Sequence, residues 1–263
     1  MPELPDVEGF RRVLADHGEG HRIARIRVVD DGVLHGTTAQ ELGRALKGRT
    51  LGAPERLGKW LIGRTDGEPA VLLHFGMTGQ LLWCEAGESE HRHDRVVFQL
   101  DDGELRYRDM RKLQGLRLAR DGAELEEALA DQGPDALSIG RGDFDELVAR
   151  SSRKLKAHLS DQSALAGLGN LTIDEILWRA RIYPNRKASG LSDDERKRVY
   201  SDMRRVLRDS VPTGQVPPRK RWLTGVRDDA PGAPCPRCGT GLAKERLSGR
   251  STVYCPNCQP EAS

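Results

Sequence analysis

The first residues of the chain, Met1-Pro2-Glu3, place a secondary amine beside a carboxylate, a pair that could carry out covalent chemistry. If Met1 is removed, Pro2 presents a free α-amino group, which titrates near ~8 and is partly unprotonated at neutral pH. Addition of a proline nitrogen to a sugar aldehyde carbon gives an iminium ion directly, and Glu3 is the nearest acid. From these residues alone, the alternative is that Pro2 only permits removal of the methionine and that Pro5 begins a helix.

Four of the five cysteines form two closely spaced pairs near the end of the chain. The pairs are Cys235-x-x-Cys238 and Cys255-x-x-Cys258, with sixteen residues between them. Together with the lack of a secretory leader, this spacing predicts a tetrahedral four-cysteine site for one structural Zn²⁺ instead of disulfides. The fifth cysteine, Cys84, lies in an apolar run, which predicts a small buried side chain.

Composition and charge indicate the class of protein and the kind of partner. The length of 263 residues suffices for two domains with sizeable cores. No stretch approaches the roughly 20 apolar residues of a membrane span, and no apolar leader is apparent, so we expect a soluble, cytoplasmic protein. The net charge of +2 divides into −7 for residues 1–150 and +9 for residues 151–263. This asymmetry predicts a polyanion bound mainly by the C-terminal half, although a solvated basic surface is the alternative.

The first 120 residues predict one helix followed mainly by short strands. Apolar residues at helical spacing between Pro5 and about His17 predict an amphipathic helix that ends at Gly18-Glu19-Gly20. Alternating apolar runs bounded by turns such as Asp66-Gly67 predict the strands of a sandwich or barrel. These runs are 23–29, 59–62, 70–75, 79–83, 95–100, 104–107 and 115–118, with a helix around 39–46 among them.

From about Leu125 the apolar period becomes helical. The candidate helices are 143–149, 152–159, 171–180 and 192–210. Two glycines in Gly167-Leu168-Gly169-Asn170 predict a tight turn, and Asn170 could cap the next helix. Such a turn leaves backbone N–H groups where a phosphate could bind, although an ordinary helix hairpin has the same pattern.

Between the last candidate helix and the cysteines, the composition changes again. Residues 211–234 contain five prolines and three glycines, which predicts a linker or mobile loop and not a separate domain. The cysteine segment that follows predicts a β-hairpin with Arg250 at its tip. Because a bound zinc ion would supply the folding free energy of so small a unit, the side chains of this hairpin are available for a ligand.

Together these segments resemble the formamidopyrimidine-DNA glycosylase and endonuclease VIII family of base-excision repair enzymes. The matching motifs follow one another through almost the whole chain, and their order and spacing make the resemblance specific. They are Pro2 to Glu8, Gly58-Lys59-Trp60-Leu61, His74-Phe75-Gly76-Met77-Thr78-Gly79, His93-Asp94, Arg106 to Leu113, Gly133 to Leu137, Gly167 to Leu177, and Cys235 to Cys258 with Gly249-Arg250-Ser251-Thr252.

The resemblance implies an α+β multidomain fold that binds double-stranded DNA, with a damaged base or abasic site, in the cleft between domains. An N-terminal helix and two-layer β-sandwich would form the catalytic domain, 1–122, and a helix-two-turn-helix DNA-binding domain would span 123–215. A linker or lesion-loop region, 216–230, would precede a zinc-finger β-hairpin, 231–263. On this basis we expect a monomeric bacterial protein, associated with the nucleoid through its DNA.

The resemblance also implies the roles of individual residues in a bifunctional DNA glycosylase and AP lyase. Pro2 would attack C1′ of the damaged nucleotide to form a Schiff base, and Glu3 would protonate the sugar-ring oxygen and shuttle protons. Lys59 would assist β-elimination, Arg250 would assist δ-elimination, and Glu175 matches a glutamate that faces the catalytic pocket. The matched phosphate-binding residues are His93, Arg111, Lys156 and Asn170, and the matched void-filling residues are Met77, Arg111 and Leu113.

These implied roles agree with the chemistry of the residue types. A base inside a duplex must be flipped out at a cost of roughly a few kcal/mol, and an apolar wedge with a basic partner can fill the vacancy. An iminium at C1′ acidifies the neighbouring C2′ protons, and the departing phosphates need cations beside them. The expected products are a free base and a one-nucleotide gap with phosphate at both ends.

Two departures from the family pattern leave the lesion open. Leu113 stands where many formamidopyrimidine-type members have phenylalanine, which removes a stacking contact with the opposite base. Residues 211–230 lack the Ser/Thr-rich lesion-capping loop and contain Pro217-Pro218-Arg219-Lys220-Arg221-Trp222 instead. Oxidised purines, oxidised pyrimidines and bulkier adducts therefore all remain possible. Two other functional classes also remain as alternatives: a DNA-binding module of this fold without turnover, and a zinc-ribbon protein that binds RNA or ribosomes.

Overall fold

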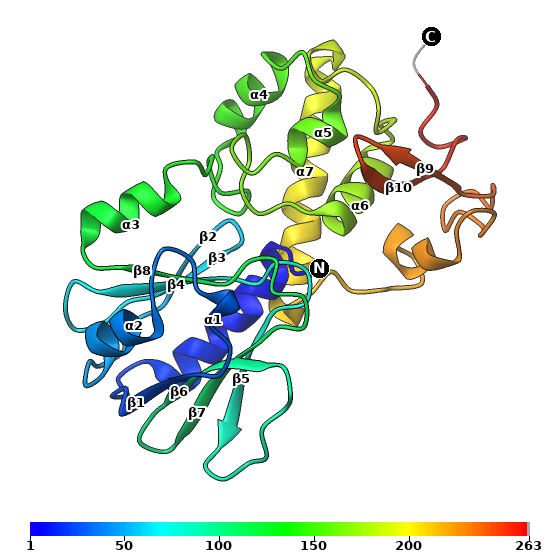
Figure 1. Ribbon diagram of the computed structural model, residues 1–263. Helices are drawn as coiled ribbons and strands as arrows, with labels where there is room; N and C mark the ends of the chain where they lie inside the picture. Colours follow the sequence, from blue (N-terminus) through cyan, green and yellow to red (C-terminus); the bar gives the residue numbers. More distant parts are fainter. Residues whose placement is uncertain (262–263) are drawn as a thin grey trace. The chain divides into compact units, whose positions relative to one another are not determined.

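The computed structural model describes residues 1–261, which form two compact units (Figure 1). The first unit consists of Met1–Pro2 and Asp6–Asp131, and the second consists of Glu3–Pro5 and the chain from Gln132 onward. The three residues that follow Pro2 are thus packed with the C-terminal half of the protein. None of the described helices is both long and apolar enough to cross a membrane.

The first unit contains two four-stranded antiparallel sheets and three helices. One sheet has the order β1-β6-β7-β5 and the other has the order β2-β3-β4-β8. Their strands are β1 Arg25–Val28, β2 Glu55–Leu57, β3 Trp60–Gly63, β4 Ala70–His74, β5 Gln80–Glu85, β6 Asp94–Gln99, β7 Gly103–Arg108 and β8 Leu116–Ala119. The helices are α1 Leu4–Gly18, α2 Ala39–Leu46 and α3 Gly122–Leu129. The predicted N-terminal helix and β-sandwich are confirmed. Strand β2 was not predicted, because three residues are too few to show an alternating apolar pattern.

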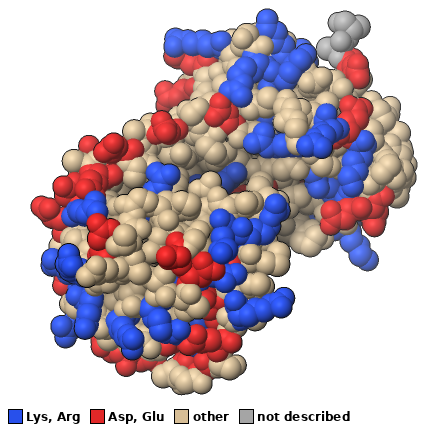
Figure 2. All heavy atoms as spheres, viewed as in Figure 1, with Lys and Arg blue, Asp and Glu red and all other residues tan. Residues whose placement is uncertain are grey.

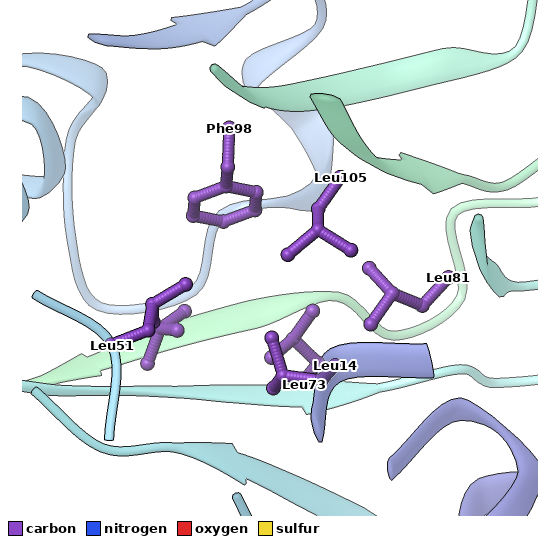
Figure 3. A pocket seen from close by; sticks show the side chains of 7 residues that line it. Leu14, Leu51, Leu73, Leu81, Phe98 and Leu105 are labelled. Carbon is purple, nitrogen blue, oxygen red and sulfur yellow. The ribbon is translucent and has the colours of Figure 1, made fainter. Parts of the chain in front are cut away.

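The core of the first unit is mainly apolar, although the paired side chains of Arg106 and Asp94 are buried as well. A small cavity of about 10 Å³ remains inside it, lined by Leu14, Leu51, Val71, Leu73, Leu81, Phe98 and Leu105. Figure 3 shows side chains from strands of both sheets and from α1 pointing into this space. A void so small and apolar stays dry, so these side chains contact one another closely. The predicted burial of Cys84 is also confirmed, since it is 3% exposed.

The second unit is helical and ends in the cysteine hairpin. Its helices are α4 Arg141–Ala149, α5 Leu155–Leu159, α6 Asn170–Ala180 and α7 Asp193–Ser210. Ser192 and Glu195 form the capping box that begins α7, and the apolar stripe of this helix is buried. Helix α5 begins three residues later than the sequence pattern predicted, because Lys154 has extended backbone and pairs with Lys187 in an isolated bridge.

The cysteine hairpin consists of β9 Ala243–Leu247 and β10 Arg250–Tyr254, joined by a two-residue turn. Ser248 and Gly249 both have positive φ, 49° and 77°, which is the type I′ geometry that matches strand twist. Arg250 therefore begins the second strand immediately after the turn. The proline-rich segment before the hairpin is folded into three short 3₁₀ helices, Val211–Thr213, Leu223–Gly225 and Arg227–Asp229, and buries Trp222 and Leu223.

Surface charge follows the asymmetry found in the sequence. On the face shown in Figure 2, Lys and Arg side chains gather over the part of the second unit that carries α5 and the cysteine hairpin. The first unit displays both signs, with acidic side chains gathered over α3. The second unit thus has the surface expected of a polyanion-binding body.

Leu105 borders the sandwich cavity and is 1% exposed. We expect Leu105→Ala to lower the free energy of unfolding by about 2–5 kcal/mol, because it enlarges a void that the sheets cannot close. Urea denaturation measures this loss. The control is Val29→Ala, since Val29 is 50% exposed, and it should change stability by less than ~0.5 kcal/mol. Equal effects would contradict the assignment of Leu105 to the core.

Candidate catalytic and DNA-binding residues

Glu3 caps a helix that lies more than 160 residues later in the chain. Its Oε1 accepts a hydrogen bond from the N–H of Leu171 at 2.8 Å, and its Oε2 accepts from the N–H of Thr172 at 3.0 Å and from the Thr172 hydroxyl. The carboxylate is 1% exposed. It satisfies free N–H groups at the start of α6 and lies at the positive end of the helix dipole.

Two glycines make room for this contact. A Cβ at residue 169 would lie 2.2 Å from the Glu3 Cδ, so only glycine fits there. Gly167 has φ +110° and its carbonyl accepts the N–H of Leu4 at 3.0 Å. The prediction that Asn170 caps α6 is wrong: Gly169 is the N-cap residue and offers no side chain, and the cap comes from Glu3.

Pro2 directly precedes this fixed carboxylate. It is partly buried, while Met1 is 52% exposed. The Pro2 nitrogen is the peptide nitrogen that follows Met1, so it becomes a nucleophile only when Met1 is removed. Since Glu3 is held by three hydrogen bonds, the position of the neighbouring proline is restricted as well.

Lys59 lies in the tight turn between β2 and β3, after Gly58 with φ +57°. His74, at the end of the paired strand β4, stacks edge-on against Trp60 with ring centroids 4.8 Å apart. Its Nδ1 accepts the N–H of Gly76, so the ring proton is on Nε2. Burial, with Lys59 and Arg117 nearby, lowers the pKa of His74 to about 4. At neutral pH, His74 is therefore a neutral hydrogen-bond donor beside a lysine.

The three matched void-filling residues lie on two neighbouring turns of the first unit. Met77 and Leu113 are 40% and 49% exposed, and Arg111 is exposed as well. Arg111 Nη1 lies 3.0 Å from the Met77 sulfur. The Arg111 backbone is fixed by Thr78 and Asp109, whose side-chain oxygens each accept its N–H at 3.1 Å. Exposed apolar side chains on an anchored turn are suited to enter a gap in a base stack.

His93, a matched phosphate-binding residue, is surrounded by arginines. Its Nε2 accepts from Arg92 Nε at 3.2 Å, and its Nδ1 lies 3.0 Å from Arg95 Nη2. Desolvation and these guanidinium groups lower the pKa of His93. The group of cations, and not a charge on the imidazole, would attract an anion at this position.

Glu175 is completely buried on α6. Its Oε1 accepts from Arg179 Nε at 2.7 Å, and its Oε2 accepts from the N–H of Thr224 at 3.1 Å. Burial raises the pKa of Glu175 in spite of these partners. The carboxyl therefore holds the proline-rich segment against α6, next to Trp222, whose ring has the Arg179 guanidinium 4.1 Å from its centroid.

The remaining matched residues of the second unit converge on strand β10. Lys156 is 2% exposed, and its Nζ forms an ion pair with Asp174. Asn170 Nδ2 donates to the carbonyl of Ser251 at 2.8 Å. Arg250 itself is exposed at the start of the strand. The predicted contacts of Lys156 and Asn170 with phosphate stay predictions, while their contacts with the hairpin are part of the fold.

The four cysteines fit the zinc ion that their spacing predicts. The sulfurs of Cys235, Cys238, Cys255 and Cys258 all lie within 4.8 Å of one another. Cys238 Sγ is 3.5 Å from the sulfurs of both Cys255 and Cys258. Tetrahedral Zn²⁺ with Zn–S bonds of about 2.3 Å requires sulfur separations of just under ~4 Å. The indole N–H of Trp178, on α6, donates to Cys235 Sγ at 3.3 Å and so orients one ligand.

Sequence reasoning missed three residues that belong to this arrangement: His74, Asp174 and Trp178. Asp174 is 0% exposed and lies between apolar positions of α6. An acid within the apolar stripe of a helix is itself a signal, because a buried charge requires a partner. Nothing in the local sequence could identify that partner.

Comparisons with known proteins agree with this geometry. Three family models match: "Formamidopyrimidine-DNA glycosylase N-terminal domain" at residues 1–116, "Formamidopyrimidine-DNA glycosylase H2TH domain" at 133–219 and "Zinc finger found in FPG and IleRS" at 232–260. Formamidopyrimidine-DNA glycosylase of Heliobacterium modesticaldum is 36% identical, over 98% of this chain and 100% of that protein. The chain belongs to the formamidopyrimidine-DNA glycosylase family.

Solved structures of this family resemble the whole chain. The Lactococcus lactis formamidopyrimidine-DNA glycosylase bound non-covalently to DNA with an AP site has a TM-score of 0.87 and 27% identity, over 98% of this chain and 100% of that one. The same enzyme with FAPY-dG-containing DNA also has a TM-score of 0.87, with 26% identity. Membership of the formamidopyrimidine-DNA glycosylase family makes this chain a DNA glycosylase, with the sandwich, the H2TH helices and the zinc finger of that family.

Gly169→Ala tests the cap on α6. The added Cβ should displace the Glu3 carboxylate and leave two N–H groups unpaired, which should cost about 1–3 kcal/mol of stability. Urea denaturation measures the loss. The matched control is Gly142→Ala in α4, where a Cβ meets open space. If both variants were equally stable, Glu3 would not be held by this helix.

The cysteine site should contain one zinc ion per chain. We expect thiol modification of the denatured protein to release about one equivalent of Zn²⁺, detected with a chromogenic chelator. Cys258→Ser should lower this amount and destabilise the hairpin. Cys84→Ser should leave it unchanged, because Cys84 is buried in the first unit. Full zinc content in Cys258→Ser would contradict the assignment.

Proposed function

We propose that this protein excises a damaged base, usually an oxidised one, from double-stranded DNA. It then cleaves the strand at the abasic site that remains. The observation that carries the proposal is the Glu3 carboxylate, fixed beside Pro2 by the first N–H groups of α6. It gives an acid of defined position next to an amine that needs only the loss of Met1. The relatives that bind DNA with an AP site or FAPY-dG support the choice of substrate.

The chemistry begins with Pro2. Its nitrogen adds to C1′ of the flipped nucleotide, the glycosidic bond breaks, and the base leaves with the bonding electrons and takes up a proton. The Pro2 nitrogen passes its N–H proton to Glu3, and Glu3 delivers a proton to the ring oxygen, so that the bond from C1′ to the ring oxygen breaks and an iminium ion remains on Pro2. Loss of a C2′ proton expels the 3′ phosphate, and a second elimination expels the 5′ phosphate. Water then releases the sugar fragment from Pro2.

The cationic residues assist the two departures. Lys59 contacts the phosphate that leaves first, and neutral His74, at the end of strand β4 opposite Trp60, can donate a hydrogen bond nearby. The guanidinium group of Arg250 contacts the phosphate that leaves second. Glu175, with its raised pKa, can hold a proton near the pocket while it fixes the proline-rich segment.

DNA binding and base flipping are assigned to the other matched residues. Met77, Arg111 and Leu113 fill the gap left by the flipped base, and His93 and Arg111 bind phosphates on the first unit. On the second unit, Asn170 binds a phosphate next to Arg250. The segment before the hairpin lacks the Ser/Thr-rich sequence of a lesion-capping loop. The substrate can therefore also be an oxidised pyrimidine or a bulkier adduct.

The protein acts as a monomer in the bacterial cytoplasm and is associated with the nucleoid through its DNA. The functional boundaries are those predicted from the sequence: a catalytic domain to residue 122, a DNA-binding domain to 215, a lesion-loop region to 230 and a zinc finger beyond it. Incision of oligonucleotides, each with one defined lesion, would identify the substrate.

Borohydride trapping tests the nucleophile. Wild-type protein should form a covalent adduct with duplex DNA that contains an abasic site, because borohydride reduces the iminium. Pro2→Gly should reduce the adduct sharply, and an uncleaved N-terminal extension should reduce it by ~100-fold or more, because an acylated nitrogen cannot attack.

The matched control is Pro69→Gly, a proline in the first unit outside the proposed site. It should trap at the wild-type rate. Unchanged trapping by the protein with the extension would exclude Pro2 as the nucleophile. Binding of abasic DNA without any incision would instead favour a DNA-binding module without turnover.

A further inference from the structure

The backbone that follows Arg250 is held by an unusual number of side chains. The carbonyl of Ser251 accepts from Asn170 Nδ2 at 2.8 Å, from Arg227 Nη2 at 3.0 Å and from Lys156 Nζ at 3.4 Å. A backbone carbonyl has two lone pairs, so three donors directed at one carbonyl oxygen leave it little freedom. The donors come from three different segments of the second unit.

A buried ionic group lies directly behind this carbonyl. Lys156 Nζ is 2.5 Å from Asp174 Oδ1 and 2.7 Å from Thr252 Oγ1. Asp174 Oδ2 accepts from the Arg227 guanidinium at 3.1 Å and from the N–H of Val253 at 3.2 Å. The side chains of Lys156, Asp174 and Arg227 are 2%, 0% and 10% exposed.

The ammonium group of Lys156 has no donor left for a ligand. Its three N–H groups are matched by Asp174, Thr252 and Ser251. A direct contact with phosphate would require one of these bonds to break and a buried ammonium to reach the surface. Lys156 is thus placed to act on DNA through the hairpin and not by itself.

The ionic group connects directly to Arg250. The Thr252 hydroxyl, which accepts from Lys156, donates to the Arg250 carbonyl at 3.3 Å. On its other side, Arg250 pairs with Leu247 across the type I′ turn. The backbone of Arg250 is therefore fixed from both directions, while its side chain remains exposed. Burying three charges is costly, so this group adds little net stability, and its effect on the structure is to fix the backbone next to Arg250.

We propose that Lys156, Asp174 and Arg227 are positioning residues that set the place of the Arg250 guanidinium for the second elimination. This inference rests on the proposed function of Arg250. The three residues touch neither the sugar nor the phosphates, and they act through Ser251, Thr252 and the strand that carries Arg250. They should therefore affect the second elimination and spare the attack by Pro2.

The experiment measures the two eliminations separately, on duplex DNA with one abasic site. Denaturing gels distinguish the unsaturated aldehyde end left by β-elimination from the 3′ phosphate left after δ-elimination, and borohydride trapping reports the step of Pro2. Lys156→Met and Thr252→Val should lower the rate of the second elimination by about tenfold or more, as Arg250→Ala should, with trapping within about threefold of wild type.

Three further measurements separate positioning from general damage to the fold. The double variant Lys156→Met/Arg250→Ala should be no slower than Arg250→Ala alone, because both changes remove the same contribution. Lys154→Met, an exposed neighbouring lysine, should leave both eliminations unchanged. Zinc content identifies any variant whose hairpin has not folded, and Thr252→Val, which is nearly isosteric, retains the ion pairs.

The possible results lead to different conclusions. One contrary result is that Lys156→Met loses trapping and both eliminations equally, while the slope of log binding constant against log salt concentration falls in magnitude by about one. This result would make Lys156 a phosphate ligand and overturn the proposal. A normal second elimination in both Lys156→Met and Thr252→Val would overturn it as well. If wild-type protein fails to form the trapped adduct, the proposed function itself is wrong.

Discussion

The structure depends on one carboxylate that caps a distant helix. Helix α6 begins at a glycine that has no side chain to offer, and the first N–H groups are satisfied by Glu3 instead. The same bonds that complete the helix also fix the start of the chain. A residue near a terminus is otherwise poorly held, and here its carboxylate is buried and accepts hydrogen bonds from Leu171 and Thr172.

Helix α6 also positions other parts of the proposed site in the second unit. Asp174 holds the strand that begins with Arg250, Glu175 holds the proline-rich segment, and Trp178 contacts a zinc ligand. Together with the Glu3 cap, these contacts join the N-terminus, the ionic group, the proline-rich segment and the metal site to a single eleven-residue helix. The proposed site is thus built on a regular helix, which positions side chains with better precision than loops alone.

The sequence predicted those features that depend on neighbours along the chain. Apolar periods located most strands and helices, the Ser192 capping box marked the start of α7, and the cysteine spacing indicated the metal site. What it missed depends on contacts between distant segments. The cap on α6 comes from a residue 168 positions away, and the partners of Asp174 lie on α5, the proline-rich segment and the hairpin. Such pairings become visible only when the chain is folded, because no local pattern encodes them.

The arrangement along α6 limits how this helix can vary. Its contacts are made in different directions around the axis, and each residue turns the helix by about 100°. Insertion or deletion of a single residue after Thr172 would rotate Asp174, Glu175 and Trp178 away from their partners at once, while the cap at the start stayed in place. Point replacements would disturb one partner at a time. Relatives should therefore show substitutions in this helix but no insertions or deletions, so that its length stays constant.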